Sequence, residues 1–437
     1  MKFTRSNHLR RRAHQIIPGG CHTYAKGDDQ YPELSPGFIV RGKGSHVFDV
    51  DGNEFIEYGM GLRAVTLGHG YERVADAASK AMYEGINFLR PSLLELEYAE
   101  ELLDVVPGAE MVKFGKHGSD ATTAALKLAR AYTGREMVAI PAQQPFLSVD
   151  DWFIGSTAMP GGIPESQRAL TVKFDYNDLN SLESLFEAYP GSIACVIMEA
   201  AKEDDPDDNY LQSVKDLCHK YGALFVIDEM ITGFRWDIGG AQKYYNIDPD
   251  LSTFGKAMAN GFSVSALMGK RDIMNLGGLN HNRERVFLMS TTHGAETHAL
   301  AAARETLRVY KELDVIGELW QKGAILRDGI QAIIDELRLN EFFELNGKDC
   351  CLVFGTRDQD RQRSQPFRTL FMQETIKRGL LMPSLIVSYA HTESDLKYTI
   401  EMIGEALVVY KKALGEGISK YLIGRSVAPV FRPYNSV

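Results

Sequence analysis

Lys256 is set apart by its neighbours. It lies in the segment 252–261, STFGKAMANG, whose other residues are small, apolar or uncharged, so no carboxylate within the segment can pair with its amine. A lysine held in a partly desolvated pocket has a lowered pKa and can act as a nucleophile. Small neighbours would let a planar ligand approach the amine. The pattern therefore indicates Schiff-base chemistry, against the alternative that this lysine is an exposed, solubilising amine.

Acidic side chains follow two short apolar runs upstream of this lysine. Glu199 comes directly after 193–198 (IACVIM), and Asp228 comes directly after 223–227 (ALFVI). Runs of this length and composition predict buried strands of a parallel sheet. Ligands bind such sheets at the carboxyl ends of the strands, so we expect Asp228 to face a crevice. The alternative is that these acids are helix N-caps or solvated loop residues.

A third feature lies in residues 112–134, VKFGKHGSDATTAALKLARAYTG. We expect a short strand, a glycine-containing turn, and a helix that opens at Ser119 or Asp120 and is capped by Gly134. The N-terminus of a helix can bind a phosphate, although any capped helix has a similar sequence pattern. A phosphate-ready helix start, an acid at a strand end and a lysine among small residues are together what pyridoxal phosphate (PLP) needs for its phosphate, its pyridine nitrogen and its aldehyde carbon.

The elements that position these groups follow from the hydrophobic pattern. Alternating residues at 38–50, followed by Asp51-Gly52-Asn53, predict a small antiparallel meander. From about residue 71, helical patterns such as 211–221 alternate with apolar runs, which predicts a parallel sheet covered by helices. A long helical pattern at 297–340 leads to a final α+β region. We expect an N-terminal segment at 1–70 that belongs to the small domain, a large cofactor-binding domain at 71–320, and a C-terminal small domain at 321–437.

Composition excludes several classes of protein. The 437 residues carry 48 Lys and Arg against 58 Asp and Glu, a formal charge of −10, and no long basic stripe, so we expect no nucleic-acid partner. No apolar run approaches the roughly 18 residues of a membrane span. The five cysteines show no C-x-x-C spacing, which indicates reduced thiols in the cytoplasm and no metal site. A P-loop and a G-x-G-x-x-G motif are both missing, which leaves a non-PLP nucleotide-binding enzyme little support.

Long segments of the chain resemble the class III (subgroup II) aminotransferases of PLP fold type I, and especially proteins similar to glutamate-1-semialdehyde aminomutase. The resemblance rests on IVRGKGSHVFDVDGNEFIEY at 39–58, LGHGYERV at 67–74, ALKLARAYTGR at 125–135, VIDEMITGFR at 226–235 and GGAQKYYNIDPDLSTFGKAMANGF at 239–262. It implies an α/β fold whose large domain has a mostly parallel seven-stranded sheet between helices. It also implies a small α+β domain built from the N- and C-terminal segments.

Five residues take cofactor roles by this resemblance. Lys256 resembles the Schiff-base lysine, which also moves the proton between the substrate and the cofactor. Asp228 resembles the partner of the pyridine nitrogen, and Met230 would pack on one face of the ring. Gly118 and Ser119 match the phosphate-binding turn of the family's S-G-T motif.

Two further cofactor positions are implied at a distance from these. Thr292, in STTHG, matches a phosphate ligand that this family takes from the neighbouring subunit, so a homodimer with a shared active site is implied. The family's Y-H-G segment is replaced by Phe146-Leu147-Ser148, which leaves Phe146 as the residue that stacks on the ring, since any aromatic face can stack.

Other departures bear on the substrate. The E-P-V-x-G-N segment becomes Glu199-Ala200-Ala201, which leaves the role of Glu199 open as a substrate-binding candidate. The aminomutase glutamate of S-Q-F-E-A has no match in MPSLIVSYAH, which argues against aminomutase activity. Changes in two further motifs place Arg63 where it could bind a carboxylate, and His22 and Tyr24 where they could meet hydroxyls. Each of these three could equally be a solvated loop residue.

The resemblance as a whole implies a PLP-dependent aminotransferase with a ping-pong mechanism. L-Glutamate would leave as 2-oxoglutarate, and the acceptor would be the aldehyde of an acidic sugar. The best candidate is 8-oxo-3-deoxy-manno-octulosonate, which would give 8-amino-3,8-dideoxy-Kdo for lipopolysaccharide biosynthesis. A 2,1-aminomutase of the glutamate-1-semialdehyde type, or a non-catalytic PLP-fold binding protein, are the alternatives.

Overall fold

The computed structural model describes residues 1–144, 146–201 and 204–435. Two compact units divide the chain: Met1–Tyr71 with Gly317–Arg432, which we call the terminal unit, and a central unit built from Glu72–Ile316. Among the helices of the described residues, none combines the length and the apolar character that crossing a bilayer requires.

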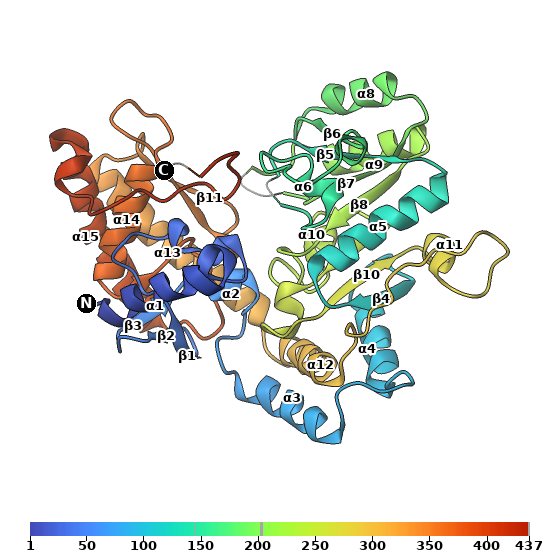
Figure 1. Cartoon of the computed structure of the whole chain (residues 1–437), viewed down its shortest axis with the longest axis horizontal. Coiled ribbons are helices and arrows are strands. Elements are labelled where there is room, and N and C mark those ends of the chain that lie inside the picture. Colours follow the sequence, from blue (N-terminus) through green and yellow to red (C-terminus); the bar gives the residue numbers. More distant parts are fainter. Residues whose placement is uncertain (145, 202–203, 436–437) are drawn as a thin grey trace. The chain divides into compact units, whose positions relative to one another are not determined.

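The central unit is an α/β unit built on a seven-stranded sheet (Figure 1). The strand order is β4-β10-β9-β8-β7-β5-β6. The two pairs that involve β10 are antiparallel and the other four are parallel, so the expected mostly parallel sheet is confirmed. The strands are β4 (Met111–Gly115), β5 (Met137–Pro141), β6 (Thr171–Phe174), β7 (Ile193–Met198), β8 (Leu224–Asp228), β9 (Leu251–Phe254) and β10 (Ser265–Gly269). Every residue of β7 and β8 is buried, as their unbroken apolar runs predict.

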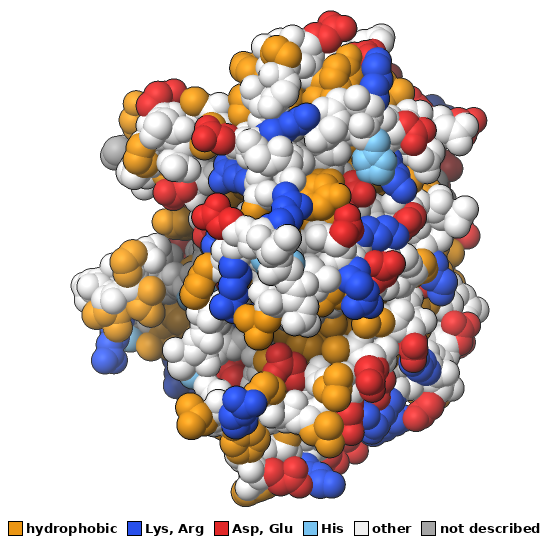
Figure 2. Space-filling model, turned by 90° about the vertical axis from the view of Figure 1, so that its right-hand side faces the viewer, with side chains coloured by type: hydrophobic (Ala, Val, Ile, Leu, Met, Phe, Trp, Pro, Cys, Tyr) orange, Lys and Arg blue, Asp and Glu red, His pale blue; other side chains and the backbone are white. Residues whose placement is uncertain are grey.

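Helices cover this sheet and supply its connections. Helix α5 packs on five of the strands, α9 packs on β8, and α12 packs against α3, α4 and η4. The helices are α3 (Glu72–Glu84), α4 (Leu93–Leu103), α5 (Gly118–Thr133), α6 (Asp151–Ile154), α7 (Glu165–Arg168), α8 (Leu179–Ala188), α9 (Tyr210–Lys220), α10 (Gly240–Tyr244), η4 (Lys256–Ala259), α11 (Arg271–Met274), η5 (Asn275–Gly277) and α12 (Thr297–Glu312). On the face drawn in Figure 2, basic and acidic side chains are interspersed.

The helical pattern at 297–340 forms two helices rather than one. Helix α12 ends at Glu312, and α13 (Val315–Leu337) begins three residues later. Leu313 between them is extended, with φ −120° and ψ 145°. The apolar periodicity continues through the break because both helices bury apolar side chains, so the pattern alone does not reveal it.

The terminal unit joins segments from both ends of the chain. Its four-stranded sheet has the order β1-β2-β3-β13, in which β1 (Ile39–Lys43), β2 (His46–Asp49) and β3 (Glu54–Glu57) form the expected antiparallel meander. The short β13 (Leu380–Leu381) adds to it in parallel with β3. The remaining elements are α1 (Thr4–Ile16), η1 (Pro18–Gly20), η2 (Tyr24–Lys26), η3 (Asp28–Gln30), α2 (Met60–Arg63), α13, the hairpin β11 (Phe343–Asn346) and β12 (Val353–Thr356), η6 (Asp349–Cys351), α14 (Gln365–Lys377), α15 (Glu393–Glu416) and η7 (Ile418–Lys420).

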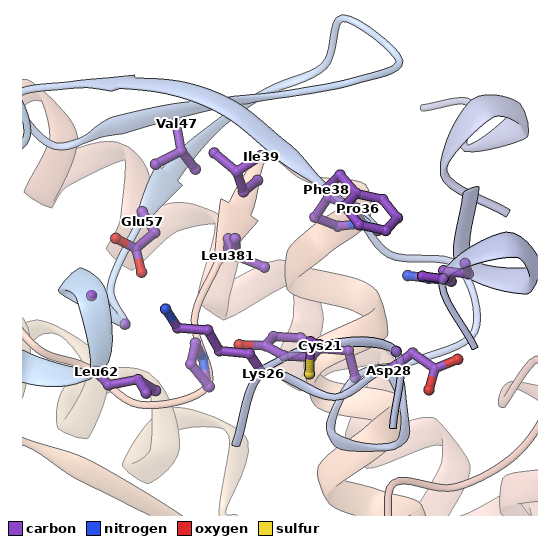
Figure 3. Close-up of a pocket in the computed structure, with 18 of the residues that line it drawn as sticks. Cys21, Lys26, Asp28, Pro36, Phe38, Ile39, Val47, Glu57, Leu62 and Leu381 are labelled. Carbon is purple, nitrogen blue, oxygen red and sulfur yellow. The ribbon is translucent and has the colours of Figure 1, made fainter. Parts of the chain in front are cut away.

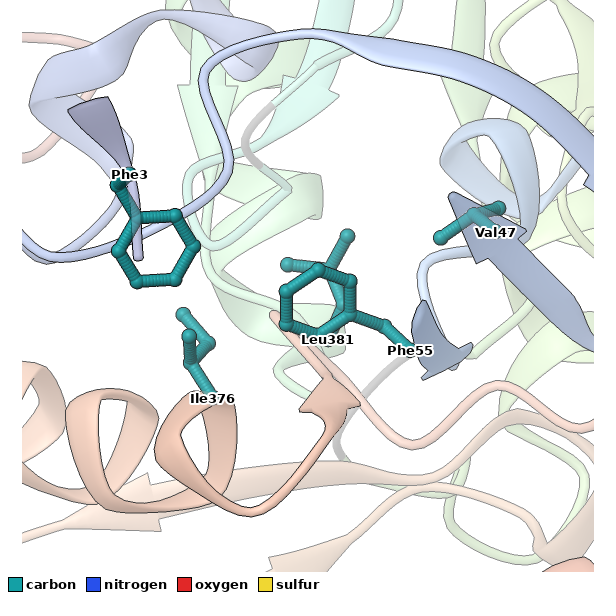
Figure 4. Packing of buried hydrophobic residues seen from close by; sticks show 5 residues of the cluster. All are labelled: Phe3, Val47, Phe55, Ile376 and Leu381. Carbon is teal, nitrogen blue, oxygen red and sulfur yellow. The ribbon is translucent and has the colours of Figure 1, made fainter. Parts of the chain in front are cut away.

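An apolar cluster ties the two chain ends together (Figure 4). Phe3, Val47 and Phe55 from the N-terminal segment pack with Ile376 and Leu381 from the C-terminal segment. Burial of such side chains contributes about 1.5–3 kcal/mol each. Neither segment could bury these residues alone, so both ends fold into one unit.

A buried histidine in this unit gives its stability a pH dependence. His391 accepts a hydrogen bond from the Ser388 N–H at 2.9 Å, its ring centroid lies 4.5 Å from that of Tyr58, and burial lowers its pKa from 6.5 to about 4 in spite of the Asp395 carboxylate. The unfolded chain binds this proton more tightly than the folded chain does. The contribution of His391 to the free energy of unfolding is therefore complete above pH 6.5 and is lost as the pH falls toward 4.

We expect the difference in unfolding free energy between pH 7 and pH 5 to shrink by about 2 kcal/mol in His391→Gln, since glutamine does not titrate. Equilibrium urea unfolding of both proteins at the two pH values measures this. His8→Gln, which removes an exposed histidine of the same unit, should leave the difference as in the parent. An equal loss in His391→Gln and the parent would assign the pH dependence to other groups.

Candidate active site

Asp228 is the last residue of β8 and is buried at the carboxyl end of the sheet. Its Oδ1 accepts hydrogen bonds from the Met230 N–H and from the Thr253 hydroxyl, each at 3.0 Å. Its pKa is raised to about 7, mainly by burial and also by the negative charge of Glu199, while the positive charge of Lys256 opposes the rise. A buried carboxylate in its ionised form is stabilised by a cationic partner.

Glu229, the next residue, has a different task. Its carboxylate accepts hydrogen bonds from the N–H groups of Ala241 and Gln242, both at 2.7 Å, and from the Thr232 hydroxyl. These bonds cap the start of α10. A Cβ added at Gly240 would lie 2.3 Å from the carboxylate, so there is no room for a side chain at this position. The two adjacent acids therefore have different partners: Asp228 is near enough to Lys256 for the lysine's charge to lower the pKa of Asp228, and Glu229 caps a helix.

Lys256 follows the neighbouring strand β9, whose Thr253 is paired with Asp228. It is the first residue of η4 and has a φ of +44°, a left-handed conformation that is rare for lysine. Residues held in such conformations cluster at functional sites because the surrounding structure fixes them. Lys256 comes 28 positions after Asp228 in the sequence. The pairing of β9 with β8 and the left-handed turn at Lys256 bring its amine toward Asp228.

Met230 connects the lysine turn with the start of α5. A Cβ added at Gly118 would lie 2.8 Å from its sulfur, and one added at Gly255 would lie 2.7 Å from it. A Cβ at either position would force the Met230 side chain to shift, so the two glycines leave room for it where it lies. The structure thereby brings together Asp228, Met230, Lys256 and Gly118, four of the residues that the sequence singles out.

Ser119 lies in the first turn of α5, next to Gly118, and the helix begins one residue before the sequence pattern predicts. Asp120 organises the turn, because its carboxylate accepts hydrogen bonds from the N–H groups of Lys116 (2.9 Å) and His117 (2.8 Å). The predicted cap at Gly134 is confirmed, with a φ of +69°. First-turn N–H groups of a helix have no partner within the helix, so this end can hold an anion.

The segment 146–152 is fixed against α5. The Val149 N–H donates to Ser119 Oγ at 3.0 Å, the Thr122 hydroxyl donates to the Leu147 carbonyl at 3.0 Å, and the Trp152 indole donates to Thr123 Oγ1 at 2.8 Å. Phe146 begins this segment and is 45% exposed, with its ring edge-on to that of Phe153. An aromatic face on an anchored segment is available to a planar ligand.

Glu199 is buried directly after β7, and a residue that sequence reasoning missed positions it. Gln144 is also buried; its amide donates to the Glu199 carbonyl at 2.7 Å and accepts from the Glu199 N–H at 2.8 Å. Gln144 comes three residues after β5, the strand that pairs with β7. Its position soon after an apolar run is the feature of the sequence that could have identified it. The two carboxylates of Glu199 and Asp228 are close enough to raise the pKa of Asp228.

Thr292 lies in the loop between η5 and α12. It is exposed, and its carbonyl accepts a hydrogen bond from the Asn87 amide at 2.8 Å. With residues 86–92, 289–291 and 294–295 it lines a cavity of about 430 Å³.

The remaining candidates lie in the terminal unit. Arg63 ends α2 with a φ of +71° and lines a cavity of about 320 Å³. His22 and Tyr24 are exposed, and neither lines the neighbouring cavity of about 380 Å³, whose wall instead includes Cys21 and Lys26 (Figure 3). Sequence reasoning missed Lys26, which is two residues from Tyr24.

Comparison with known proteins assigns this arrangement to a family. Residues 28–388 match the family described as aminotransferase class-III. The chain is 33% identical over 439 residues to a glutamate-1-semialdehyde 2,1-aminomutase of Sulfurihydrogenibium azorense, covering 94% of this chain and all of the relative. It is 31% identical to a 3-aminobutyryl-CoA aminotransferase of Cloacimonas acidaminovorans, covering 95% of this chain and 99% of the relative. The FumI protein of Sphingopyxis sp. MTA144, solved with PLP, superimposes with a TM-score of 0.85 at 28% identity, over 94% of this chain and 98% of that one.

Proposed function

The chain belongs to the class-III aminotransferases, a family of fold type I enzymes with PLP as cofactor, and from this premise we propose that it transfers an amino group from L-glutamate to the aldehyde of an acidic sugar. The sugar we favour is 8-oxo-3-deoxy-manno-octulosonate, with 8-amino-3,8-dideoxy-Kdo as the product and lipopolysaccharide biosynthesis as its use. The transfer rests on one observation: Asp228 and Lys256 are held beside each other at the carboxyl ends of paired strands. The sugar rests on sequence resemblance and on the polar substitutions at Arg63, His22 and Tyr24.

The residues of the central unit fit the cofactor. The start of α5 at Gly118 and Ser119 suits its phosphate, and the buried carboxylate of Asp228 suits a protonated pyridine nitrogen. The glycines at 118 and 255 keep the backbone close to Met230, which leaves that side chain as one wall for a ring. Phe146 is the candidate for the other wall. Together these groups match the phosphate, the nitrogen and the two faces of PLP.

Each residue has a task of its own in the proposed reaction. When bound, PLP withdraws electrons from the carbon that carries the substrate's amino group. Asp228, as a carboxylate, keeps positive charge at the pyridine nitrogen, and the hydrogen bonds from Met230 and Thr253 hold its Oδ1 in place. Lys256 holds the cofactor and carries the proton to and from the substrate carbon as general base and acid. Arg63, His22, Tyr24 and Glu199 are assigned to the substrate.

The second candidate is an aminomutase of the glutamate-1-semialdehyde type, favoured by the names of several relatives at about one third identity. Against it, the segment 382–391, MPSLIVSYAH, has no match for the glutamate of the aminomutase motif. An aminomutase would need no 2-oxoacid product. A binding protein without catalysis has less support, because Lys256 and Asp228 are both retained.

The enzyme is proposed to act as a homodimer in the cytoplasm. Thr292 is exposed, and large apolar side chains are also exposed on the nearby segment, at Tyr83, Leu89 and Leu93. Apolar surface of this kind suits a protein interface. A partner docked there could receive Thr292 as a ligand for its phosphate. The cytoplasmic location rests on the five cysteines, none of which forms a disulfide.

We expect L-glutamate to discharge the PLP-bound enzyme with release of one equivalent of 2-oxoglutarate, and the acidic sugar aldehyde to restore its visible absorption band. Absorption spectra with a 2-oxoglutarate assay measure both half-reactions. The control is glutamate-1-semialdehyde, which should not be converted to 5-aminolevulinate. If no amino acid discharges the bound cofactor while that conversion occurs, the aminomutase replaces the transferase.

A further inference from the structure

A cavity of about 320 Å³ in the terminal unit has an uneven distribution of charge. Two arginines, Arg63 and Arg368, line it, and its described lining contains no aspartate or glutamate. The polar residues Tyr31, Ser384 and Gln365 also line it. A cavity of this size can hold a small organic molecule, and its charge suits an anion.

Arg368 has no ion pair with an aspartate or glutamate among the residues that the structure describes. It lies in α14, its Nη2 donates to the Pro383 carbonyl at 2.6 Å, and its guanidinium lies 4.6 Å from the centre of the Phe354 ring. Burial lowers its pKa, and Tyr31 is the one titratable group that opposes this, so no carboxylate of the described chain stabilises the charge. Arg378, directly after the same helix, has ion pairs to Glu374 and Glu405 instead.

The hydrogen bonds of Arg368 are only partly used. A guanidinium has five N–H donors in a planar fork that matches a carboxylate or a phosphate. One of them is committed to Pro383, and the cation–π contact with the Phe354 ring further restricts the position of the guanidinium. The remaining donors can therefore bind an anion without a large loss of side-chain freedom.

The C-terminal segment closes one side of this cavity. Val427, Ala428 and Pro429 belong to the wall, and they lie beyond residues 28–388, the part matched by the family. The Val427 N–H donates to Thr369 Oγ1 at 2.8 Å, and the Gln30 amide donates to the Ala428 carbonyl at 2.9 Å. The segment is thus attached both to α14 and to the N-terminal segment.

The second cavity of this unit extends the space. Tyr31, Gly59, Leu62 and Pro383 line both cavities. The larger one, of about 380 Å³, has apolar walls at Val47 and Leu381 and the Lys26 side chain along it (Figure 3). A ligand whose anionic group meets Arg368 has room for its remaining atoms there.

We propose that the cavity between Arg63 and Arg368 is a binding site for the carboxylate or phosphate group of a small organic anion, with Arg368 as the principal ligand. That this anion is a substrate rests on the proposed function; the binding itself does not. A carboxylate would come from the amino donor or from an acidic acceptor. A phosphate would come from an ester of the acceptor or from free phosphate.

Calorimetric titration of the PLP-bound enzyme with glutarate and, separately, with inorganic phosphate tests the site. We expect Arg368→Gln to weaken binding of the preferred probe at least about tenfold, since a charge-assisted hydrogen bond is lost. Arg368→Lys should recover part of it, because lysine keeps the charge but not the fork. Arg12→Gln removes an exposed positive charge from α1 of the same unit and should bind as the parent does. Circular dichroism and the PLP absorption band verify that each variant is folded.

The outcomes separate this site from the proposed reaction. Binding that depends on Arg368 supports the site, and competitive or non-competitive inhibition by the probe then identifies a substrate or an effector position. Equal affinities in the parent and Arg368→Gln, or no binding of either probe to the parent, would overturn it. If Arg368→Gln does not fold, the comparison uses Arg368→Lys and Ser384→Ala. Discharge by L-glutamate, recorded on the same samples, reports on the transferase function whether or not the site exists.

Discussion

Lys256→Ala is expected to slow turnover with L-glutamate by about 10⁴-fold or more, while the protein stays folded and still binds PLP. Alanine removes both the covalent attachment and the group that moves the proton, and general acid–base catalysis alone contributes up to about 10⁴-fold. The buried acid at 228 and the start of α5 are unchanged, so binding of the cofactor through its nitrogen and phosphate should persist. Stopped-flow spectroscopy of the glutamate half-reaction measures the rate.

An exposed lysine provides the control for this variant. Lys311→Ala removes a positive charge from α12 at an exposed position and should react as the parent does. Addition of a small primary amine such as methylamine should restore part of the rate in Lys256→Ala and none in the parent. A Lys256→Ala protein that completes the half-reaction at the parental rate would remove Lys256 from the mechanism.

Asp228→Asn is expected to lower kcat by about 10²–10³-fold, the magnitude seen when one preorganised electrostatic group is removed. The substitution keeps the size of the side chain and one oxygen that can accept from the Met230 N–H, but it removes the charge beside Lys256. An uncharged amide cannot keep the pyridine nitrogen protonated. Steady-state kinetics with the sugar aldehyde, together with equilibrium dialysis of PLP, should show a lower rate and weaker cofactor binding.

Glu229→Gln is the matched control, because it neutralises the adjacent buried acid. Its carboxylate caps α10 rather than facing the candidate site, so this variant should lose thermal stability and retain most of its kcat. The opposite pattern, with Glu229→Gln inactive and Asp228→Asn active, would exchange the roles of the two acids.

The hydrophobic pattern of the chain was sufficient for much of the fold. The strand predicted at 193–198 is confirmed, and the one predicted at 223–227 is confirmed one residue later, at 224–228 with Asp228 as its last residue, because residues buried on both faces of a sheet are mostly apolar. The meander at the N-terminus is confirmed for a related reason, since strands with one buried face alternate. Motif resemblance added the family, which the comparisons confirm, and its cofactor.

What the pattern could not reveal depends on contacts between distant segments. The pairing of β13 with β3, which joins the chain ends, involves a strand of two residues, too short to have a period. The break between α12 and α13 lies inside a continuous apolar pattern. Both are decided by what packs against the segment and not by its own residues.

The same division holds for the candidate site. The sequence by itself determined which residue types are present, a lysine among small residues, an acid after a buried run and a capped helix start, because backbone chemistry and strand burial restrict those positions locally. Only the tertiary structure decided that Glu229 caps α10, that Met230 fits between Gly118 and Gly255, and that Arg368 has no acid to neutralise it among the described residues. The physical reason is that the pKa of a carboxylate, the space for a side chain and the partner of a buried charge are set by atoms from other parts of the chain, which the local sequence does not contain.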